Sequence, residues 1–166
     1  MSVLRPATKE DKLLIENLYN LYRNDLSDFC DEFRFLDDDG FYSKGISEEL
    51  LPFGDGVETY IITDYGCPAG LIVVTDERYA FEGCARKIED LYVIRPARGK
   101  GLAVKAAREV TRACPGRWCL SIYKRNRPAK RFWDRFISEE GTLVCAVPDE
   151  DDTVCMMFDI KNTENS

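Results

Sequence analysis

The sequence predicts a mixed α/β fold in which one mixed sheet is flanked by helices. Short runs rich in β-branched residues alternate with helical patterns along the chain. Two such runs are separated by turn residues, as in a hairpin, and another leads through a glycine-containing turn into a helix. Hairpins combined with strand–helix–strand units favour a single sheet covered by helices.

The N-terminal part predicts a short strand and a helix. Val3–Arg5 is the strand, Thr8 is the predicted N-cap, and Asp11 at the third helical position completes a capping-box-like start. The stretch Asp28–Asp39 holds six acidic residues and one Arg among phenylalanines, so it is too aromatic for a disordered tail. We predict a second helix or an ordered loop there.

The middle of the chain predicts three strands and a helix. Tyr60–Thr63 and Leu71–Val74 form a hairpin around a turn-rich segment. Ile88–Ile94 is the third strand, and Gly99–Ala113 is a helix that the sequence Cys-Pro-Gly ends.

The C-terminal part predicts a strand, a helix and two further strands: Trp118–Tyr123, Asn126–Ile137, Leu143–Val147 and Val154–Ile160. The length of 166 residues fits one domain better than two. We expect a single domain over residues 1–160 and a frayed C-terminus at 161–166.

Composition excludes several classes of site. The chain has no His, which excludes Ser-His-Asp and Cys-His catalysis and leaves acid–base chemistry to carboxylates, Tyr, Cys, Lys or water. The seven Cys form no C-x-x-C pair, so we expect buried hydrophobic thiols rather than disulfides or a metal site. No apolar run approaches the roughly 20 residues that cross a bilayer, and we expect a cytoplasmic protein without a membrane partner.

The net charge of −7 hides an uneven distribution. The segment Arg95–Arg131 holds twelve Lys or Arg and one acid, Glu109. A basic segment is typical of anion binding, but the acidic remainder of the chain would repel nucleic acid. We therefore expect a compact anion with a few phosphates as the partner, and no nucleic acid.

A turn with two glycines joins the predicted strand Ile88–Ile94 to the following helix. Gly99 and Gly101 permit unusual backbone angles and the close approach of an oxygen, and the exposed amides and dipole at a helix start favour phosphate. Arg98 and Lys100 add full charges. The spacing is neither G-x-G-x-x-G nor a Walker loop. An ordinary glycine turn beside a solvated basic face is the alternative interpretation.

Three segments resemble the GCN5-related N-acetyltransferase (GNAT) superfamily. Arg98–Ala103, following a strand, resembles the superfamily motif Q/R-x-x-G-x-G/A. Asn126–Trp133 resembles its next motif, an Asn and then an Ala before an aromatic pair, and Leu4–Thr8 resembles its usual opening. The resemblance implies a single, mostly antiparallel sheet of about six to seven strands that splays at the cofactor site. It also implies acetyl-CoA as co-substrate, with no metal.

The resemblance further implies which residues hold the cofactor. In the superfamily, the turn amides bind the CoA pyrophosphate, the preceding strand pairs with pantetheine, and the next motif lines the other side. The residues assigned in this way are Leu91, Tyr92, Val93, Arg98, Gly99, Lys100, Gly101, Leu102, Ala103, Val104, Asn126, Ala129 and Trp133.

Amine acetylation requires a base, because a lysine-like amine with a pKa of about 10.4 is protonated at neutral pH. Glu89 and Asp90 are the candidates, and they face opposite sides of the strand unless a bulge intervenes. The resemblance favours Glu89; an ordinary ion pair or structural role is the alternative for either residue. Many relatives carry a general-acid Tyr where this chain has Trp133. The thiolate leaves unaided, or water, Tyr123 or another Tyr assists its departure.

The resemblance places the acceptor site beside the first helices, where carboxylates and aromatic rings suit a cationic amine. Tyr22, Asp28, Phe29 and Glu32 are the candidate residues, with a solvated acidic face as the alternative. We expect an N-acetyltransferase that moves an acetyl group to a small cationic amine or a lysine-bearing peptide in a ternary complex, with a homodimer left open. The alternative function is a non-catalytic acyl-CoA-binding or protein-interaction module on the same fold.

Overall fold

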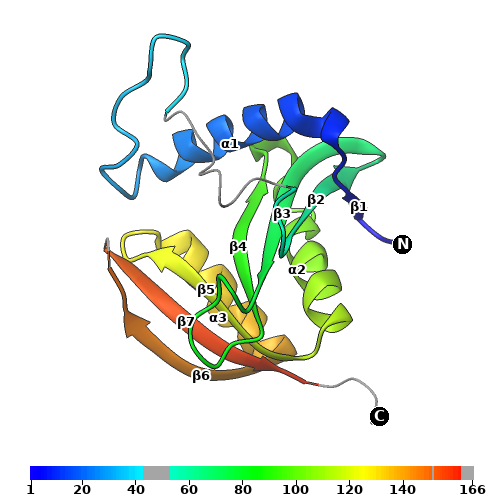
Figure 1. Cartoon of the computed structure of the whole chain (residues 1–166), viewed down its shortest axis with the longest axis vertical. Helices are drawn as coiled ribbons and strands as arrows, with labels where there is room; N and C mark the ends of the chain where they lie inside the picture. Colours follow the sequence, from blue (N-terminus) through cyan, green and yellow to red (C-terminus); the bar gives the residue numbers. More distant parts are fainter. Residues whose placement is uncertain (43–52, 151, 162–166) are drawn as a thin grey trace.

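The computed structural model describes residues 1–42, 53–150 and 152–161. Within these residues the chain forms a seven-stranded sheet of order β1-β2-β3-β4-β5-β7-β6 (Figure 1). The strands are β1 (Leu4–Pro6), β2 (Val57–Asp64), β3 (Cys67–Asp76), β4 (Arg86–Val93), β5 (Gly116–Tyr123), β6 (Gly141–Pro148) and β7 (Thr153–Ile160). All neighbours pair antiparallel except β4 and β5, which confirms the expected sheet. Of the C-terminus predicted to be frayed, 161–166, residues 162–166 lie outside the described part.

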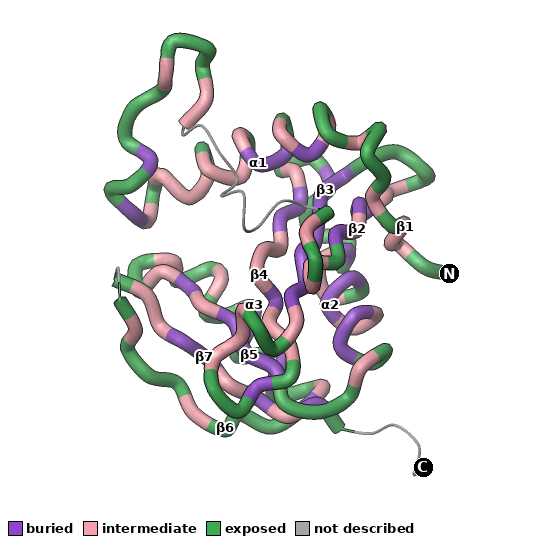
Figure 2. The backbone as a smooth tube through the Cα atoms, in the orientation of Figure 1, coloured by how far each residue is buried: buried purple, intermediate pink, exposed green. Residues whose placement is uncertain are grey.

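Helices cover both faces of this sheet (Figure 1). They are α1 (Lys12–Leu26), α2 (Leu102–Ala113) and α3 (Arg127–Glu140), with short 3₁₀ turns at η1 (Lys9–Asp11) and η3 (Arg95–Ala97). Alternation along β3 separates two hydrophobic clusters: Leu71 and Val73 pack with α1, whereas Ile72 and Val74 pack in the cluster that contains α2 and α3. The buried segments in Figure 2 follow these inner faces. No helix of the described residues has the length and apolar character needed to span a membrane.

Strand β4 is fully paired on one side only. Its pairing with β3 continues to Val93, but its parallel pairing with β5 is limited to Arg86 and Lys87, which lie opposite Trp118 and Cys119. Beyond Lys87 the two strands diverge, and the described residues supply no further β4–β5 pairs. The predicted splay is therefore present. It lies at the C-terminal end of β4, which leads into the glycine turn.

A β-bulge interrupts β4 within this splayed part. Val73 of β3 lies opposite Asp90, and the next residue, Val74, lies opposite Ile88, so Glu89 is the extra residue. A bulge breaks the strict alternation of side chains along a strand. Glu89 and Asp90 therefore need not face opposite sides.

Two local predictions at helix starts had different outcomes. The capping box at Thr8 and Asp11 is present, with the Asp11 carboxylate accepting from the Thr8 amide at 2.8 Å. Helix α2, however, begins at Leu102 rather than at the predicted Gly99. Gly99 and Gly101 have φ values of +78° and +77°, and this left-handed conformation cannot continue a right-handed helix.

Residues 27–42 form turns and bends, so the ordered loop, and not the second helix, is the correct alternative for the acidic stretch. The loop folds back onto α1. The Asn20 side chain donates to the Gly40 carbonyl at 3.2 Å and accepts from the Tyr42 amide at 3.1 Å. The Tyr42 hydroxyl donates to Asn24 at 2.6 Å. These contacts hold the acidic loop at the end of α1.

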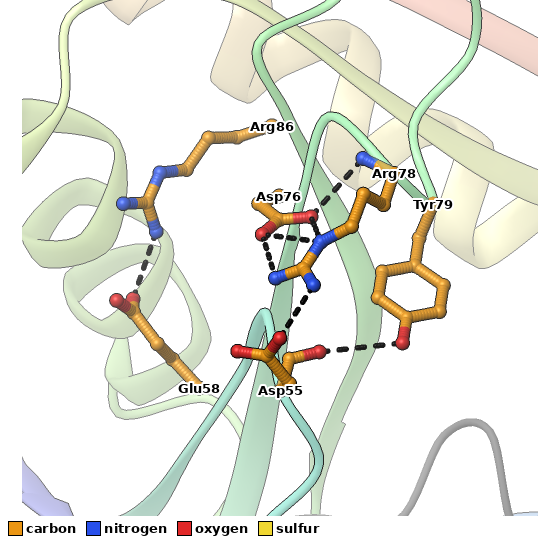
Figure 3. A network of polar contacts seen from close by, with 6 residues as sticks. All are labelled: Asp55, Glu58, Asp76, Arg78, Tyr79 and Arg86. Carbon is orange, nitrogen blue, oxygen red and sulfur yellow. Dashed lines mark hydrogen bonds and ion pairs between the residues drawn. The ribbon is translucent and has the colours of Figure 1, made fainter.

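A polar network joins the start of β2, the end of β3 and the start of β4 (Figure 3). These strand ends lie at the edge of the sheet opposite the glycine turn. The Arg78 guanidinium contacts Asp76 at 2.7 Å and Asp55 at 2.6 Å, which joins the end of β3 to the start of β2. Arg86 of β4 pairs with Glu58 of β2 at 2.9 Å across the intervening strand. Water and salt screen ion pairs as accessible as these, so we interpret the network as one that orients the strand ends and adds little stability.

The cysteines are free thiols. The structure buries Cys30, Cys84, Cys119 and Cys155, as predicted for small hydrophobic residues. It leaves Cys114 and Cys145 partly exposed, and Cys67 fully exposed at the start of β3. The prediction of burial is therefore wrong for Cys67.

Candidate active site

A pocket of about 520 Å³ runs along the turn between β4 and α2. We call it the turn pocket; Gly99, Gly101 and the first residues of α2 line it. Gly101 is the N-cap of α2 and has no side chain with which to bond the first helical amides. Apart from each glycine's own neighbours in the chain, no described residue has an atom within 4 Å of where a Cβ would stand on either glycine. The turn thus offers open backbone donors and a positive dipole end, which suit phosphate.

Two arginines flank this turn. The Arg98 Nε donates to the Val93 carbonyl at 2.8 Å, and its guanidinium lies over the Tyr92 ring, 5.6 Å from the centroid. Arg95 precedes it by one turn of η3. Both arginines line the turn pocket, and both donate to the carboxylate of Asp25 at the end of α1. The charged lining of the turn pocket therefore consists of two cations, Arg95 and Arg98, and two carboxylates, Asp25 and Asp28.

A second pocket, of about 420 Å³, contains the predicted catalytic carboxylates. We call it the carboxylate pocket, because Glu32, Glu89 and Asp90 line it. Its aromatic lining consists of Tyr19, Tyr22, Phe33, Tyr123 and Trp133. Carboxylates beside aromatic faces attract an organic cation. Across the described part of the chain, no three metal-binding side chains gather into a candidate metal site.

The two pockets share a wall. The residues that line both are Tyr22, Leu26, Leu91, Asn126, Ala129 and Trp133. Leu91 lies on the splayed part of β4, immediately after Glu89 and Asp90. The Asn126 side chain accepts from the Ala129 amide at 3.1 Å and so caps α3 at this wall. Groups bound in the two pockets would meet at the splay.

The environment of the carboxylate pocket raises the pKa of Asp90. Burial raises its pKa to about 6, against the opposing effect of the hydrogen bond that the Tyr19 hydroxyl donates to it at 2.7 Å. The nearby charge of Glu89 raises it further. Burial also raises the pKa of Tyr19, so Tyr19 remains a neutral donor. A carboxylate with a pKa near 6 is ionised at neutral pH yet accepts a proton more readily than an ordinary Asp.

Glu89 is engaged by a neighbour on its own strand. Its Oε1 lies 2.9 Å from Nζ of Lys87, and both side chains are largely buried, at 17% and 16% exposed. The predicted alternative of an ion pair on the sheet therefore describes a real contact of Glu89. One oxygen of the Glu89 carboxylate is therefore already in contact with the Lys87 ammonium.

Trp133 packs as part of the wall between the pockets. It is 6% exposed, and its ring meets Phe132 and Phe136 nearly edge to face, with centroids 4.8 and 5.6 Å away. Its indole offers no acidic proton to a leaving thiolate. The Tyr123 hydroxyl lies in the carboxylate pocket and donates to Glu32 at 3.2 Å.

The predicted cofactor residues line the turn pocket with one exception. These are Leu91, Tyr92, Val93, Arg98, Gly99, Gly101, Leu102, Ala103, Val104, Asn126, Ala129 and Trp133. Lys100 is not in the lining; its ammonium pairs with Asp64 at 2.6 Å and lies over the Tyr65 ring.

The four predicted acceptor residues divide between the pockets. Glu32 lines the carboxylate pocket, Tyr22 lines both pockets, and Asp28 and Phe29 line the turn pocket alone. Phe29 and Asp28 belong to the acidic loop, which borders the cofactor side as well as the acceptor side. Their roles stay predictions.

Sequence reasoning did not select Tyr19, Asp25 or Arg95 as site residues, although Tyr19 and Asp25 belong to the aromatic and acidic region expected to form the acceptor site. Tyr19 lies one helical turn before Tyr22, so helical spacing alone places the two on one face. Asp25 belongs to the acidic stretch only by proximity, and its pairing with residues of the turn had no signal in the sequence. Arg95 lay within the basic segment but outside the glycine motif.

Solved structures share this fold. An acetyltransferase from Thermus thermophilus is 16% identical, with a TM-score of 0.65 over 95% of this chain and 98% of that chain. The histone acetyltransferase HPA2 and related acetyltransferase from Corynebacterium glutamicum is 15% identical, with a TM-score of 0.68 over 99% of both chains. AAC(6')-Ib in complex with ribostamycin and coenzyme A is 19% identical, with a TM-score of 0.69 over 97% of this chain and 94% of that chain.

Sequence comparison gives the family directly. No curated protein matches the chain. The model of the Acetyltransferase (GNAT) family, however, matches residues 15–137. That span runs from α1 to α3 and includes every residue that lines the turn pocket. The chain therefore belongs to the acetyltransferase (GNAT) family.

Proposed function

We propose that the protein is an N-acetyltransferase that moves an acetyl group from acetyl-CoA to a primary amine. The acceptor is a small cationic amine or a lysine-like side chain, and it attacks the thioester directly while both substrates are bound. The observation that carries the proposal is the wall shared by the turn pocket and the carboxylate pocket, with Leu91 beside the two carboxylates of β4.

The turn pocket fits a CoA thioester by its donor chemistry. Gly99 and Gly101 hold the backbone in the left-handed region with open space beside them, and α2 begins at once. Arg95 and Arg98 supply cations at the same end. Pyrophosphate binding needs such amides and guanidinium groups. Coenzyme A is bound by AAC(6')-Ib, whose fold this chain shares.

The carboxylate pocket fits a cationic acceptor. Glu32, Glu89 and Asp90 outnumber the single cation in its lining, Arg23. An ammonium entering the pocket gains from these charges and from the tyrosine rings. It must then lose a proton before it can attack.

Asp90 is the proposed proton acceptor. Its raised pKa places it closer to neutrality than an ordinary carboxyl group, whereas the Glu89 carboxylate is engaged by Lys87. This preference reverses the one drawn from the resemblance, and Glu89 remains the second candidate. The leaving thiolate has a pKa near 8.5 and departs without an acid. Burial raises the pKa of Tyr123, so its phenol offers a hydrogen bond and not a ready proton.

The test combines turnover with binding. Thiol release from acetyl-CoA is measured with a panel of cationic, neutral and anionic acceptors, and CoA binding is measured by calorimetry. We expect Asp90→Asn to lower kcat by about 10²- to 10³-fold while CoA still binds. Glu89→Gln, which makes the same acid-to-amide change one residue away, should lose less.

Each result has a different consequence. Binding of acetyl-CoA without thiol release for any amine would favour the non-catalytic module, for which Trp133 at the usual Tyr position is the supporting observation. Turnover of only anionic or neutral acceptors would contradict the cationic acceptor. A larger loss in Glu89→Gln than in Asp90→Asn would return the base to Glu89. The single domain over residues 1–160, the homodimer and the cytoplasmic location stay predictions.

A further inference from the structure

The carboxylate of Asp25 bridges the two arginines of the turn pocket. Its Oδ1 accepts from Nη2 of Arg95 at 2.7 Å, and its Oδ2 accepts from Nη2 of Arg98. Asp25 is only 17% exposed, whereas Arg95 is 67% and Arg98 46% exposed. The anion is thus sheltered, and the cations it holds are open to solvent.

This bridge lies inside the proposed phosphate site. Asp25, Arg95 and Arg98 all line the turn pocket together with the two glycines. Asp25 comes from the last turn of α1, 70 residues before Arg95 in the sequence. Arg98 is also fixed from behind by the Val93 carbonyl and by the face of the Tyr92 ring. Its guanidinium therefore stays directed at the pocket, where Asp25 occupies one of its donors.

A carboxylate and a phosphate compete for the same donors. Guanidinium groups bind both anions through the same planar N–H groups. A phosphate bound by the same two guanidinium groups would also stand beside the Asp25 charge, and like charges at close range repel. Bringing in the phosphate therefore requires the Asp25 bridge to weaken or break.

We propose that Asp25 is an internal competitor for the cofactor phosphates and sets the affinity of the turn pocket. The inference rests on the proposed function, since it assumes that CoA phosphates bind at the turn. Asp25 keeps Arg95 and Arg98 paired between catalytic cycles. It also lowers the affinity of the turn pocket for CoA, so the CoA product dissociates faster.

The test is CoA binding by calorimetry, without any acceptor or turnover. Asp25→Asn keeps the size and polarity of the side chain and removes its charge, and we expect it to bind CoA about 5- to 20-fold more tightly at low salt. The gain should shrink at about 0.5 M salt, where screening weakens the competition. A merely structural effect of the substitution would not depend on salt in this way.

Asp64→Asn is the matched control. Asp64 also pairs with a cation of the same turn, Lys100, but neither residue lines the turn pocket. Its CoA affinity should equal that of the wild type within about two-fold. An equal gain in both variants would overturn the specific role of Asp25 and reduce the effect to net charge.

Every substitution of Asp25 also removes two ion pairs and could disturb the fold. A second variant and a second measurement therefore accompany the first. Asp25→Ser removes the carboxylate with a smaller side chain, and the CoA-induced rise in Tm should exceed the wild-type rise in both Asp25 variants. If the wild type binds CoA and both Asp25 variants bind it equally or more weakly, the inference is wrong and the proposed function stands. No CoA binding by any of the proteins overturns the proposed function and the inference with it.

Discussion

The hydroxyl of Tyr19 donates a hydrogen bond of 2.7 Å to Oδ2 of Asp90, and this bond joins α1 to the bulged part of β4. Tyr19 is 8% exposed, so water competes little for the bond. The bond favours the ionised carboxylate, while burial disfavours it more strongly. The two largest effects on the pKa of the proposed base therefore oppose each other.

Tyr19→Phe removes the hydrogen bond to Asp90 and leaves the carboxyl group buried. The pKa of Asp90 should then rise above about 6, by up to about one further unit. Because the base works only when ionised, the acidic limb of the kcat/KM profile should move to higher pH. Tyr60→Phe makes the same change at a tyrosine that lines neither pocket and should leave the midpoint in place. An unmoved or lowered midpoint in Tyr19→Phe would contradict Asp90 as the titrating group.

The raised pKa of Asp90 also predicts a cost in stability. A folded-state pKa of about 6 against an ordinary 3.8 means that the folded protein holds this proton more tightly than the unfolded chain. The resulting stabilisation is present at low pH and is lost as the pH rises from about 4 to 6. Asp90→Asn should therefore raise the free energy of unfolding at pH 7, by at most about 3 kcal/mol, with little change near pH 4.

Urea unfolding at the two pH values tests this prediction. Asp76→Asn is the control of opposite sign, because the hydrogen bond from Arg78 lowers the pKa of Asp76. That variant should lose stability at pH 7. If Asp90→Asn is less stable than the wild type at pH 7, the ionised carboxylate does not destabilise the folded protein, and the prediction is wrong.

The glycine turn and the strand before it were predictable because their signals are local. Gly99 and Gly101 are two residues apart, and the positive φ at each is a property of that residue type. The capping box at Thr8 and Asp11 is equally local, since both partners lie within one turn. A structural feature that depends on a few consecutive residues can be predicted from their residue types and spacing.

Contacts between distant segments were not predictable in the same way. Tyr19 and Asp90 are 71 residues apart, and Arg98 lies 73 residues beyond Asp25. The bulge at Glu89 depends on how β4 pairs with β3, and its neighbours in sequence give no sign of it. The choice between Glu89 and Asp90 as base rests on burial and on Lys87, and burial exists only once the chain has folded.

Gly70 permits the close approach of β3 to β4 at the cofactor end of the sheet. A Cβ at this position would lie 2.0 Å from the Tyr92 carbonyl oxygen, so Gly70→Ala must push the strands apart. We expect a loss of about 2–4 kcal/mol in stability and weaker CoA binding, because Tyr92 and Val93 line the turn pocket. Gly83→Ala, where φ is +83° but space is open, should cost about 1 kcal/mol and leave CoA binding unchanged. Equal losses of stability in both variants would contradict the close approach.

Gly101→Ala and Gly66→Ala separate backbone strain from phosphate recognition. The two glycines have nearly equal φ values, +77° and +79°, and open space beside both. Each substitution should therefore destabilise the fold by about 1 kcal/mol, measured by thermal or urea unfolding. Only Gly101 lies in the turn pocket and precedes α2, so only Gly101→Ala should weaken CoA binding, by about ten-fold or more. A methyl group there stands where a phosphate oxygen must approach the first amides of α2. If both variants lose stability equally and both still bind CoA like the wild type, the amides at the start of α2 are not the phosphate donors.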